Sequence, residues 1–196
     1  IKLAIGILRE RIQCPELNKL LTVIDNSINS IDRTIEHILY FHRFKNPCRS
    51  LVEVSSVVQG VVNSVCIPEN VSIFTNIPPF CYWFGDSKAL ERILSNLISN
   101  SVKAISRRAG CGIIKLSVIP DDEAIRIAVE DNGGGFDPDF NENAIAPFKS
   151  GFPGGIGLGL TIVKQLVEAN NGQLRLFNST KDGSVWGVVT IDFKKA

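Results

Sequence analysis

The sequence lacks the features of several specialised classes of protein. Its five cysteines, an odd number, are far apart and form no Cys-x-x-Cys pair, and its two histidines do not have the spacing of metal ligands. This argues against a disulfide framework or a structural zinc site and favours a reducing compartment. There is no run of about 18 apolar residues and no signal peptide. With a formal net charge of only +1, nothing indicates binding to nucleic acid or to an anionic membrane.

Methionine is absent, even at position 1, and the chain begins inside a helical pattern. We therefore expect these residues to be part of a longer protein and to lie in the cytoplasm, with a membrane anchor upstream left open. The composition is that of a folded protein, with 44% hydrophobic and 21% charged residues. A length of 196 residues is enough for one domain and an appendage.

The appendage is predicted to be a helical hairpin formed by residues 1–46. Residues 1–12 have apolar side chains at helical spacing, and Cys14-Pro15 interrupts the pattern. A second helix, residues 16–44, has apolar residues that alternate strictly at spacings of four and three, namely Leu17, Leu21, Ile24, Ile28, Ile31, Ile35 and Ile38. Such a seam is typical of a coiled coil. We predict a homodimer in which two hairpins form a four-helix bundle; packing of this helix on the following domain is the alternative.

Residues 47–196 are predicted to form a separate α+β domain, with a mixed, mostly antiparallel sheet and helices on one face, in two layers. Alternating apolar residues and turn signals predict its strands. Ser55 is predicted to cap its first helix and Asp86 or Ser87 its second. The expected strands are 51–54, 71–75, 80–84, 113–119, 124–130, 174–177 and 185–193, and the expected helices are 55–65, 88–107 and 158–169.

Half of the 16 glycines lie between Gly133 and Gly159. Glycine weakens helices and strands, so a cluster indicates backbone that approaches a ligand closely or adopts a positive φ. Phosphate is a common ligand of such backbone, because bare N–H groups can surround its oxygens. The run Gly155-Ile156-Gly157-Leu158-Gly159-Leu160 leads into a helix, whose first N–H groups would face phosphates. Alone, this run is weak evidence, and it is neither a dinucleotide fingerprint nor a P-loop.

The predicted helix 88–107 carries a polar face on which Asn96, Asn100 and Lys103 align. An amide oxygen is a suitable ligand for Mg²⁺, and a lysine can neutralise phosphate oxygens. Asp131 ends a strand just before three glycines, where its carboxylate can accept a hydrogen bond from an amino group such as that of adenine. A solvated helix face and a turn-forming aspartate are the simpler alternatives.

Four segments together resemble sensor histidine kinases. Residues 96–100 resemble their N box, 131–136 their first glycine box, Pro147-Phe148 their F box and 155–163 their second glycine box. The four occur in the order and at the spacing typical of that family. The hairpin is similar to the dimerisation and histidine-phosphotransfer domain of the family, so the resemblance covers nearly the whole chain.

The resemblance implies an ATP-binding domain of the Bergerat type in residues 47–196, with a mobile lid over residues 137–154. It implies that Asn96 and Asn100 hold Mg²⁺ and phosphates, that Lys103 contacts phosphate and that Asp131 recognises the adenine amine. The rest of the implied ATP site comprises Gly133, Gly135, Phe136, Lys149, Ser150, Gly155, Gly157, Leu158, Gly159 and Leu160.

Asn96 distinguishes between branches of the wider ATPase superfamily. Gyrase-like and chaperone ATPases carry a glutamate at this position, which acts as the general base for water. An amide cannot accept that proton, whereas a neutral imidazole is already nucleophilic. Asn96 therefore favours transfer of the γ-phosphoryl group to histidine, for relay to an aspartate of a response regulator receiver domain. The alternatives are a degenerate scaffold that has lost ATP binding and an ATPase of the gyrase or chaperone type.

The chain also departs from the family pattern. No histidine occurs in residues 1–12, so we expect the phospho-acceptor upstream of Ile1 and assign no catalytic residue here. His42 precedes Pro47 at a similar spacing but lacks the acidic neighbour of the family. Ser101 stands where the family usually has alanine, and Lys149-Ser150 replace the usual lid sequence.

Overall fold

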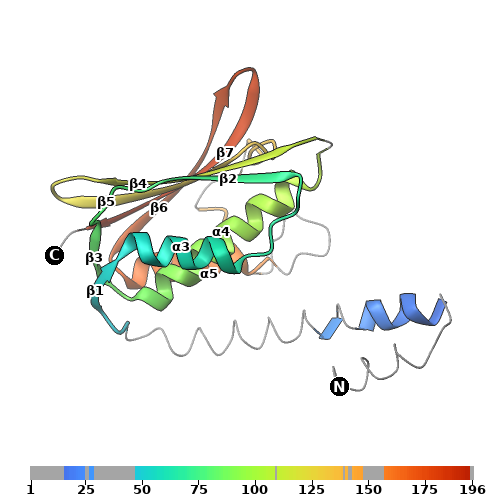
Figure 1. The fold of residues 1–196 in the computed structure, drawn as a ribbon, viewed down its shortest axis with the longest axis horizontal. Coiled ribbons are helices and arrows are strands. Elements are labelled where there is room, and N and C mark those ends of the chain that lie inside the picture. Colours follow the sequence, from blue (N-terminus) through green and yellow to red (C-terminus); the bar gives the residue numbers. More distant parts are fainter. Residues whose placement is uncertain are drawn as a thin grey trace. The chain divides into compact units, whose positions relative to one another are not determined.

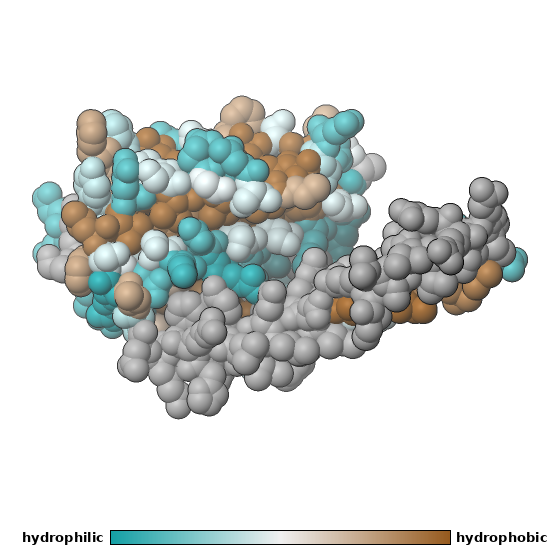
Figure 2. Space-filling view, turned by 60° about the horizontal axis from the view of Figure 1, so that its bottom comes forward, coloured by the Kyte–Doolittle hydropathy of each residue, from teal (hydrophilic) through white to brown (hydrophobic). Residues whose placement is uncertain are grey.

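The computed structural model describes residues 16–24, 27–28, 47–108, 110–138, 140, 143–147 and 157–194. The chain divides into two compact units, Ile1–Arg43 and Phe44–Ala196. In the first unit, the described residues 16–24 and 27–28 are helical. Leu21 is buried there, while Leu17, Leu20, Val23 and Ile24 are exposed, and the coloured atoms of this segment are mostly brown in Figure 2. The other seam positions, from Ile31 onward, and the predicted helix of residues 1–12 lie outside the described residues.

The second unit is built on a five-stranded sheet with the order β2-β4-β5-β7-β6 (Figure 1). Only the β2–β4 pair is parallel. The strands are β2 (Val71–Asn76), β4 (Gly112–Pro120), β5 (Ala124–Asp131), β6 (Gly172–Lys181) and β7 (Ser184–Lys194). β1 (Ser50–Glu53) and β3 (Tyr82–Gly85) form a separate antiparallel pair. The mixed, mostly antiparallel sheet predicted from the sequence is therefore confirmed.

Three helices cover one face of the sheet, namely α3 (Val54–Ser64), α4 (Ser87–Ile105) and α5 (Gly159–Ala169) (Figure 1). α4 packs into the core, because its apolar residues recur at helical spacing and form one face. On this face Leu90, Ile93, Leu94 and Ile98 are fully buried. Figure 2 turns the helical side forward and shows apolar residues in bands between hydrophilic ones. The predicted placement of the helices on one face is confirmed.

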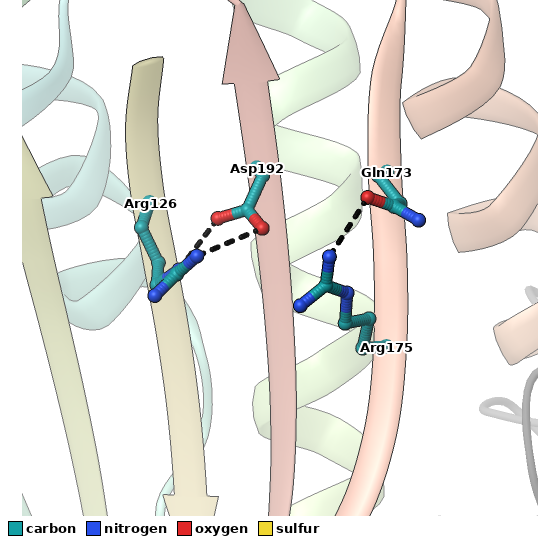
Figure 3. Close-up of polar contacts among 4 residues, drawn as sticks. All are labelled: Arg126, Gln173, Arg175 and Asp192. Carbon is teal, nitrogen blue, oxygen red and sulfur yellow. Dashed lines mark hydrogen bonds and ion pairs between the residues drawn. The ribbon is translucent and has the colours of Figure 1, made fainter. Parts of the chain in front are cut away.

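The opposite face of the sheet carries polar contacts between neighbouring strands (Figure 3). Arg126 of β5 donates from Nε to Asp192 Oδ1 of β7 over 2.6 Å and from Nη2 to Oδ2 over 3.1 Å. Arg175 of β6 donates to the side chain of Gln173 on the same strand. An antiparallel sheet can leave one face in water in this way, while its other face packs on helices.

Asp86 fixes the beginning of α4, as one of the two predicted caps. Its Oδ1 accepts hydrogen bonds from the backbone N–H groups of Lys88 and Ala89. Its Oδ2 accepts another from Cys48, near the start of the second unit. The Asp86 N–H in turn donates to the side chain of Asn170, at the end of α5. One buried carboxylate thus joins the start of α4 to the segment that leads into β1.

Two local predictions were wrong. Ser55 does not cap α3, which begins one residue earlier; Glu53 is its N-cap, and the Glu53 carboxylate accepts hydrogen bonds from the Ser55 and Ser56 hydroxyls. The strand expected at 80–84 begins only at Tyr82. Phe80 lies in a turn after Pro79 with a φ of +57°, a conformation that is incompatible with a strand.

Candidate functional site

Asn96 and Asn100 of α4 lie together against the first residue of α5. A Cβ atom added to Gly159 would lie 3.3 Å from Asn96 Oδ1 and 3.6 Å from both polar atoms of the Asn100 amide. The Asn96 Nδ2 donates to the Arg92 carbonyl over 2.8 Å, which leaves Oδ1 directed toward Gly159. Glycine at this position allows the amino end of α5 to approach both amides.

This place can bind both an anion and a hard cation. The first N–H groups of a helix point away from its body and attract negative charge. Amide oxygens suit Mg²⁺, which takes few protein ligands and completes its shell with phosphate and water. The residues present therefore fit a magnesium–phosphate group. Among the described residues, no group of three His, Cys, Asp or Glu could hold a metal ion by itself.

Asp131 lies at the end of β5, opposite Ile114 of β4 and Gly187 of β7. Its Oδ2 accepts a hydrogen bond from the Ser101 hydroxyl of α4 over 2.8 Å, and its Oδ1 accepts one from the Gly133 N–H over 3.0 Å. Burial raises the pKa of the Asp131 carboxyl, and these two hydrogen bonds partly offset the increase. An orientated, partly desolvated carboxylate is well suited to accept one more hydrogen bond from a ligand.

The three glycines after Asp131 serve two different physical needs. At Gly133 a Cβ would come within 2.6 Å of the Ala104 Cβ and 2.8 Å of Asp131 Oδ1, so the absence of a side chain permits close packing on α4. Gly134 and Gly135 have φ values of +105° and +77°, which disfavour residues with a side chain. A Cβ at Gly135 would also lie only 2.5 Å from Asn178 Oδ1.

Asn178 of β6 is a residue of this site that the sequence did not reveal. Its Oδ1 accepts a hydrogen bond from the Phe136 N–H over 2.7 Å, and its Nδ2 donates to the Phe136 carbonyl over 2.9 Å. The Phe136 ring stacks on Phe140, with centroids 5.9 Å apart. The available signal was weak: asparagine is uncommon within strands.

The remaining predicted residues are placed less fully. Lys103 lies in the last turn of α4 with an exposed side chain. Gly157 has a φ of +73°, and Leu158 and Leu160 are half-buried against the core. Part of the predicted lid lies outside the described residues, namely residues 139, 141–142 and 148–154, which include Phe148, Lys149 and Ser150. The same holds for Gly155. In the described part of the chain, no helix is long and apolar enough to cross a membrane.

The match to known families agrees with this geometry. Residues 85–196, more than half of the chain, match the family of histidine kinase-, DNA gyrase B- and HSP90-like ATPases. The chain belongs to this ATPase family. The matched region contains α4, β5 and α5, the elements that carry the residues described above. The kinase-type ATPase core that the four sequence boxes indicated is confirmed, and membership of the family supports nucleotide binding.

Its curated relatives include proteins named as histidine kinases. The chain is 25% identical over 189 residues to the signal transduction histidine-protein kinase AtoS of Escherichia coli. The matched region covers 94% of this chain and 31% of AtoS. It is 26% identical over 184 residues to sporulation kinase C of Bacillus subtilis. Here the matched region covers 90% of this chain and 42% of that kinase. The chain therefore spans less than half of the length of these relatives.

Solved structures share the fold at lower identity. The Acinetobacter baumannii histidine kinase AdeS has a TM-score of 0.69 at 20% identity, over 96% of this chain and 89% of AdeS. Full-length ShkA, solved in complex with AMPPNP, has a TM-score of 0.74 at 21% identity, over 98% of this chain and 42% of ShkA. These solved kinase structures thus share the α+β fold class that was predicted from the sequence, and the prediction is confirmed.

Proposed function

We propose that this chain is the catalytic core of a sensor histidine kinase, which binds Mg-ATP between α4 and the lid of residues 137–154 and transfers its γ-phosphoryl group to a histidine. The observation that supports this most directly is the approach of Gly159 to Asn96 and Asn100. On the same helix, Ser101 bonds to Asp131. One helix thus carries a phosphate end and a base end of a nucleotide site.

At the base end, Asp131 accepts a hydrogen bond from the adenine amine. Gly133 and Gly135 shape the wall beside the base, and the loop with Phe136 is held in place by Asn178. These groups are already paired within the protein, so little reorganisation accompanies binding.

At the phosphate end, Asn96 and Asn100 hold Mg²⁺ and phosphate oxygens. The ion, when bound, neutralises charge on the phosphates. Lys103, Lys149 and Ser150 contribute further phosphate contacts. Gly155, Gly157 and Gly159, which follow the lid together with Leu158 and Leu160, allow the lid to approach the triphosphate. A site of this kind promotes phosphoryl transfer by positioning and charge neutralisation.

The acceptor is an imidazole because position 96 is an amide. Water or serine as nucleophile would need a general base there, whereas an imidazole nitrogen attacks with its own lone pair. The new bond joins this nitrogen to the γ-phosphorus, the bond from that phosphorus to the bridging oxygen breaks, and ADP leaves. The imidazole loses its N–H proton, and an aspartate of a response regulator then receives the phosphoryl group.

We further propose a cytoplasmic homodimer assembled through residues 1–46, with a response regulator receiver domain as its partner. Leu17 and Ile24, two seam positions, are 44% and 47% exposed in the single chain, and a second copy would cover them. The structure of ThkA, 16% identical with a TM-score of 0.69, was solved in complex with the response regulator protein TrrA, which supports a partner of this class.

The test is a calorimetric titration of the chain with Mg-ATP. Asn100→Asp places negative charge against the phosphates and should abolish binding while the domain stays folded. Asn63→Asp makes the same change at an exposed position of α3 and should leave the affinity unchanged. Equal affinity in Asn100→Asp and the wild type would refute the site.

The class of reaction is tested on the full-length protein incubated with labelled ATP. A histidine kinase retains an acid-labile, base-stable phosphoramidate. Sustained ATP hydrolysis that depends on a glutamate would instead identify a gyrase- or chaperone-type ATPase. No binding at millimolar Mg-ATP would identify a degenerate scaffold.

A further inference from the structure

Ser101 is a buried polar residue in the middle of the candidate site. It is 4% exposed and follows Asn100 directly on α4. Its hydroxyl is the donor that reaches Asp131 Oδ2 over 2.8 Å. The two residues are 30 positions apart in the chain, so the hydrogen bond joins α4 to the end of β5.

Two other serines, one in this helix and one at its C-cap, behave differently. Ser95 donates to the Arg92 carbonyl three residues earlier, and Ser106, the C-cap, donates to the Val102 carbonyl. This local bond is the usual one for a serine in a helix. Ser101 instead donates to a carboxylate outside its own helix, that of Asp131. An alanine would fit the helix better and bury no polar atom, so the hydroxyl serves the carboxylate rather than the helix.

The hydrogen bond determines what the Asp131 carboxylate can still recognise. Each oxygen has two lone-pair directions, and Ser101 and Gly133 occupy one on each oxygen. The ionised carboxylate is then only an acceptor, which pairs with the 6-amino group of adenine and repels the 6-oxo group of hypoxanthine. A protonated carboxyl would also be a donor and could donate a hydrogen bond to the 6-oxo group.

We propose that Ser101 is a positioning residue that strengthens the base selectivity of the nucleotide site, by orienting the Asp131 carboxylate for a 6-amino purine. This inference rests on the proposed function, because it assumes that a purine nucleotide occupies the site.

The surroundings of the carboxylate support this role. The described neighbours that face it are uncharged: Ser101 comes from α4, Gly133 from the following loop and Gly187 from β7. Burial raises the pKa of Asp131, and the hydrogen bonds from Ser101 and Gly133 lower it. The Ser101 hydroxyl is the one side-chain contribution, among the described residues, that favours the ionised form.

The experiment compares Mg-ATP with Mg-ITP, which differ in the 6-substituent of the base, by titration of the 196-residue chain. Ser101→Ala should weaken ATP binding about tenfold, as expected for a lost hydrogen bond to a charged group, and should weaken ITP binding less. The ratio of the two affinities therefore falls. Ser95→Ala removes a serine hydroxyl from the same helix and should leave both affinities unchanged. Ser101→Thr keeps the hydroxyl and should restore the wild-type ratio.

The pH profile separates positioning from packing. ATP binding falls as Asp131 becomes protonated, and removal of the hydroxyl raises the pKa of this carboxyl. In Ser101→Ala the loss should therefore begin at a higher pH than in the wild type. Ser101→Cys fills the space of the hydroxyl with a larger atom that is a weak donor, so a loss that resembles Ser101→Ala cannot come from the space that the hydroxyl leaves empty.

The outcomes separate the two proposals. If the wild type binds neither nucleotide at millimolar concentration, the proposed function itself is wrong. If the wild type binds ATP, but Ser101→Ala weakens ATP and ITP equally and keeps the wild-type pH profile, the inference about Ser101 is overturned and the nucleotide site stands.

Discussion

The carboxylate of Asp86 should be one of the strongest single contributors to the stability of the second unit. It is 6% exposed and accepts hydrogen bonds from three backbone N–H groups, those of Lys88, Ala89 and Cys48, over 2.9, 3.1 and 3.0 Å. Asp86→Ala removes the N-cap of α4, which costs about 1 kcal/mol. It also removes the partly buried hydrogen bond between the N–H of Cys48, an exposed residue, and this charged group, which costs about 1–2 kcal/mol more.

The expected total is a loss of about 2–3 kcal/mol in the free energy of unfolding, or about 4–12 °C in Tm for a unit of this size. Asp86→Asn keeps an oxygen for the cap but offers an NH₂ group where Cys48 donates, so it should lose about half as much. Both tryptophans, Trp83 and Trp186, belong to the second unit. Their fluorescence during urea or thermal unfolding therefore reports on this unit.

Asp122→Ala is the matched control, because Asp122 is exposed in the turn between β4 and β5. It should change the stability by less than about 0.5 kcal/mol. A Tm of Asp86→Ala within about 1 °C of the wild type would refute the reasoning. So would an Asp86→Asn variant as unstable as Asp86→Ala, because the loss would then not follow the number of hydrogen bonds.

Three further changes test other parts of the site. Gly135→Ala should cost about 2–3 kcal/mol in thermal unfolding, because strain at φ +77° adds to a clash with Asn178; Gly183→Ala, with φ +72° and open space around it, should cost only about 1 kcal/mol. Asp131→Asn should abolish ATP binding yet keep or raise the apo Tm at neutral pH. Burial raises the pKa of Asp131, so ionisation of this carboxyl above its pKa destabilises the folded wild type. The wild type therefore regains stability as the pH falls through this pKa, and the variant should lack this pH dependence of stability. Asn178→Ala removes both bonds to Phe136 and should weaken ATP binding about tenfold, with a small change in Tm.

Local patterns in the sequence were sufficient to predict the elements of the second unit and the class of its fold. The alternation in residues 124–130 predicted β5, and the apolar spacing along residues 88–107 predicted α4. Partners distant in the chain were harder. β2 and β3 follow each other closely, yet β2 pairs in parallel with β4 and β3 pairs with β1. No local signal specifies that choice, because it depends on which faces the helices bury.

The candidate site divides in the same way. Asn96, Asn100, Asp131 and the glycines were identified because their residue types and spacing are unusual. Asn178 and Ser101 were not assigned roles, because each acts through a contact with a residue 42 or 30 positions away. The sequence shows which residues are chemically suited to a ligand, but it does not show which residues hold them in place.

The proposed phosphate site lies where two helices pack together. α4 begins at Asp86, which bonds to Cys48, and carries Asn96 and Asn100 further along. α5 begins at Gly159, beside those amides, and ends at Ala169, whose carbonyl accepts a hydrogen bond from Arg49 Nη2 over 2.9 Å. Ten residues of helix, about 15 Å, separate the phosphate end from residues 48–49.

The phosphate end and the segment that leads into β1 are therefore positioned by the same pair of helices. A displacement of α5 along its axis would change both the distance from Gly159 to the amides and the hydrogen bond at Ala169, because a helix moves largely as a rigid rod. The close approach at Gly159 tolerates little movement, since even a Cβ at this position would be in tight contact with Asn96. The hydrogen bonds of Asp86 and Arg49 thus stabilise the end of the helix pair that lies opposite the proposed nucleotide site. In this way they help to fix the distance from Gly159 to the two amides.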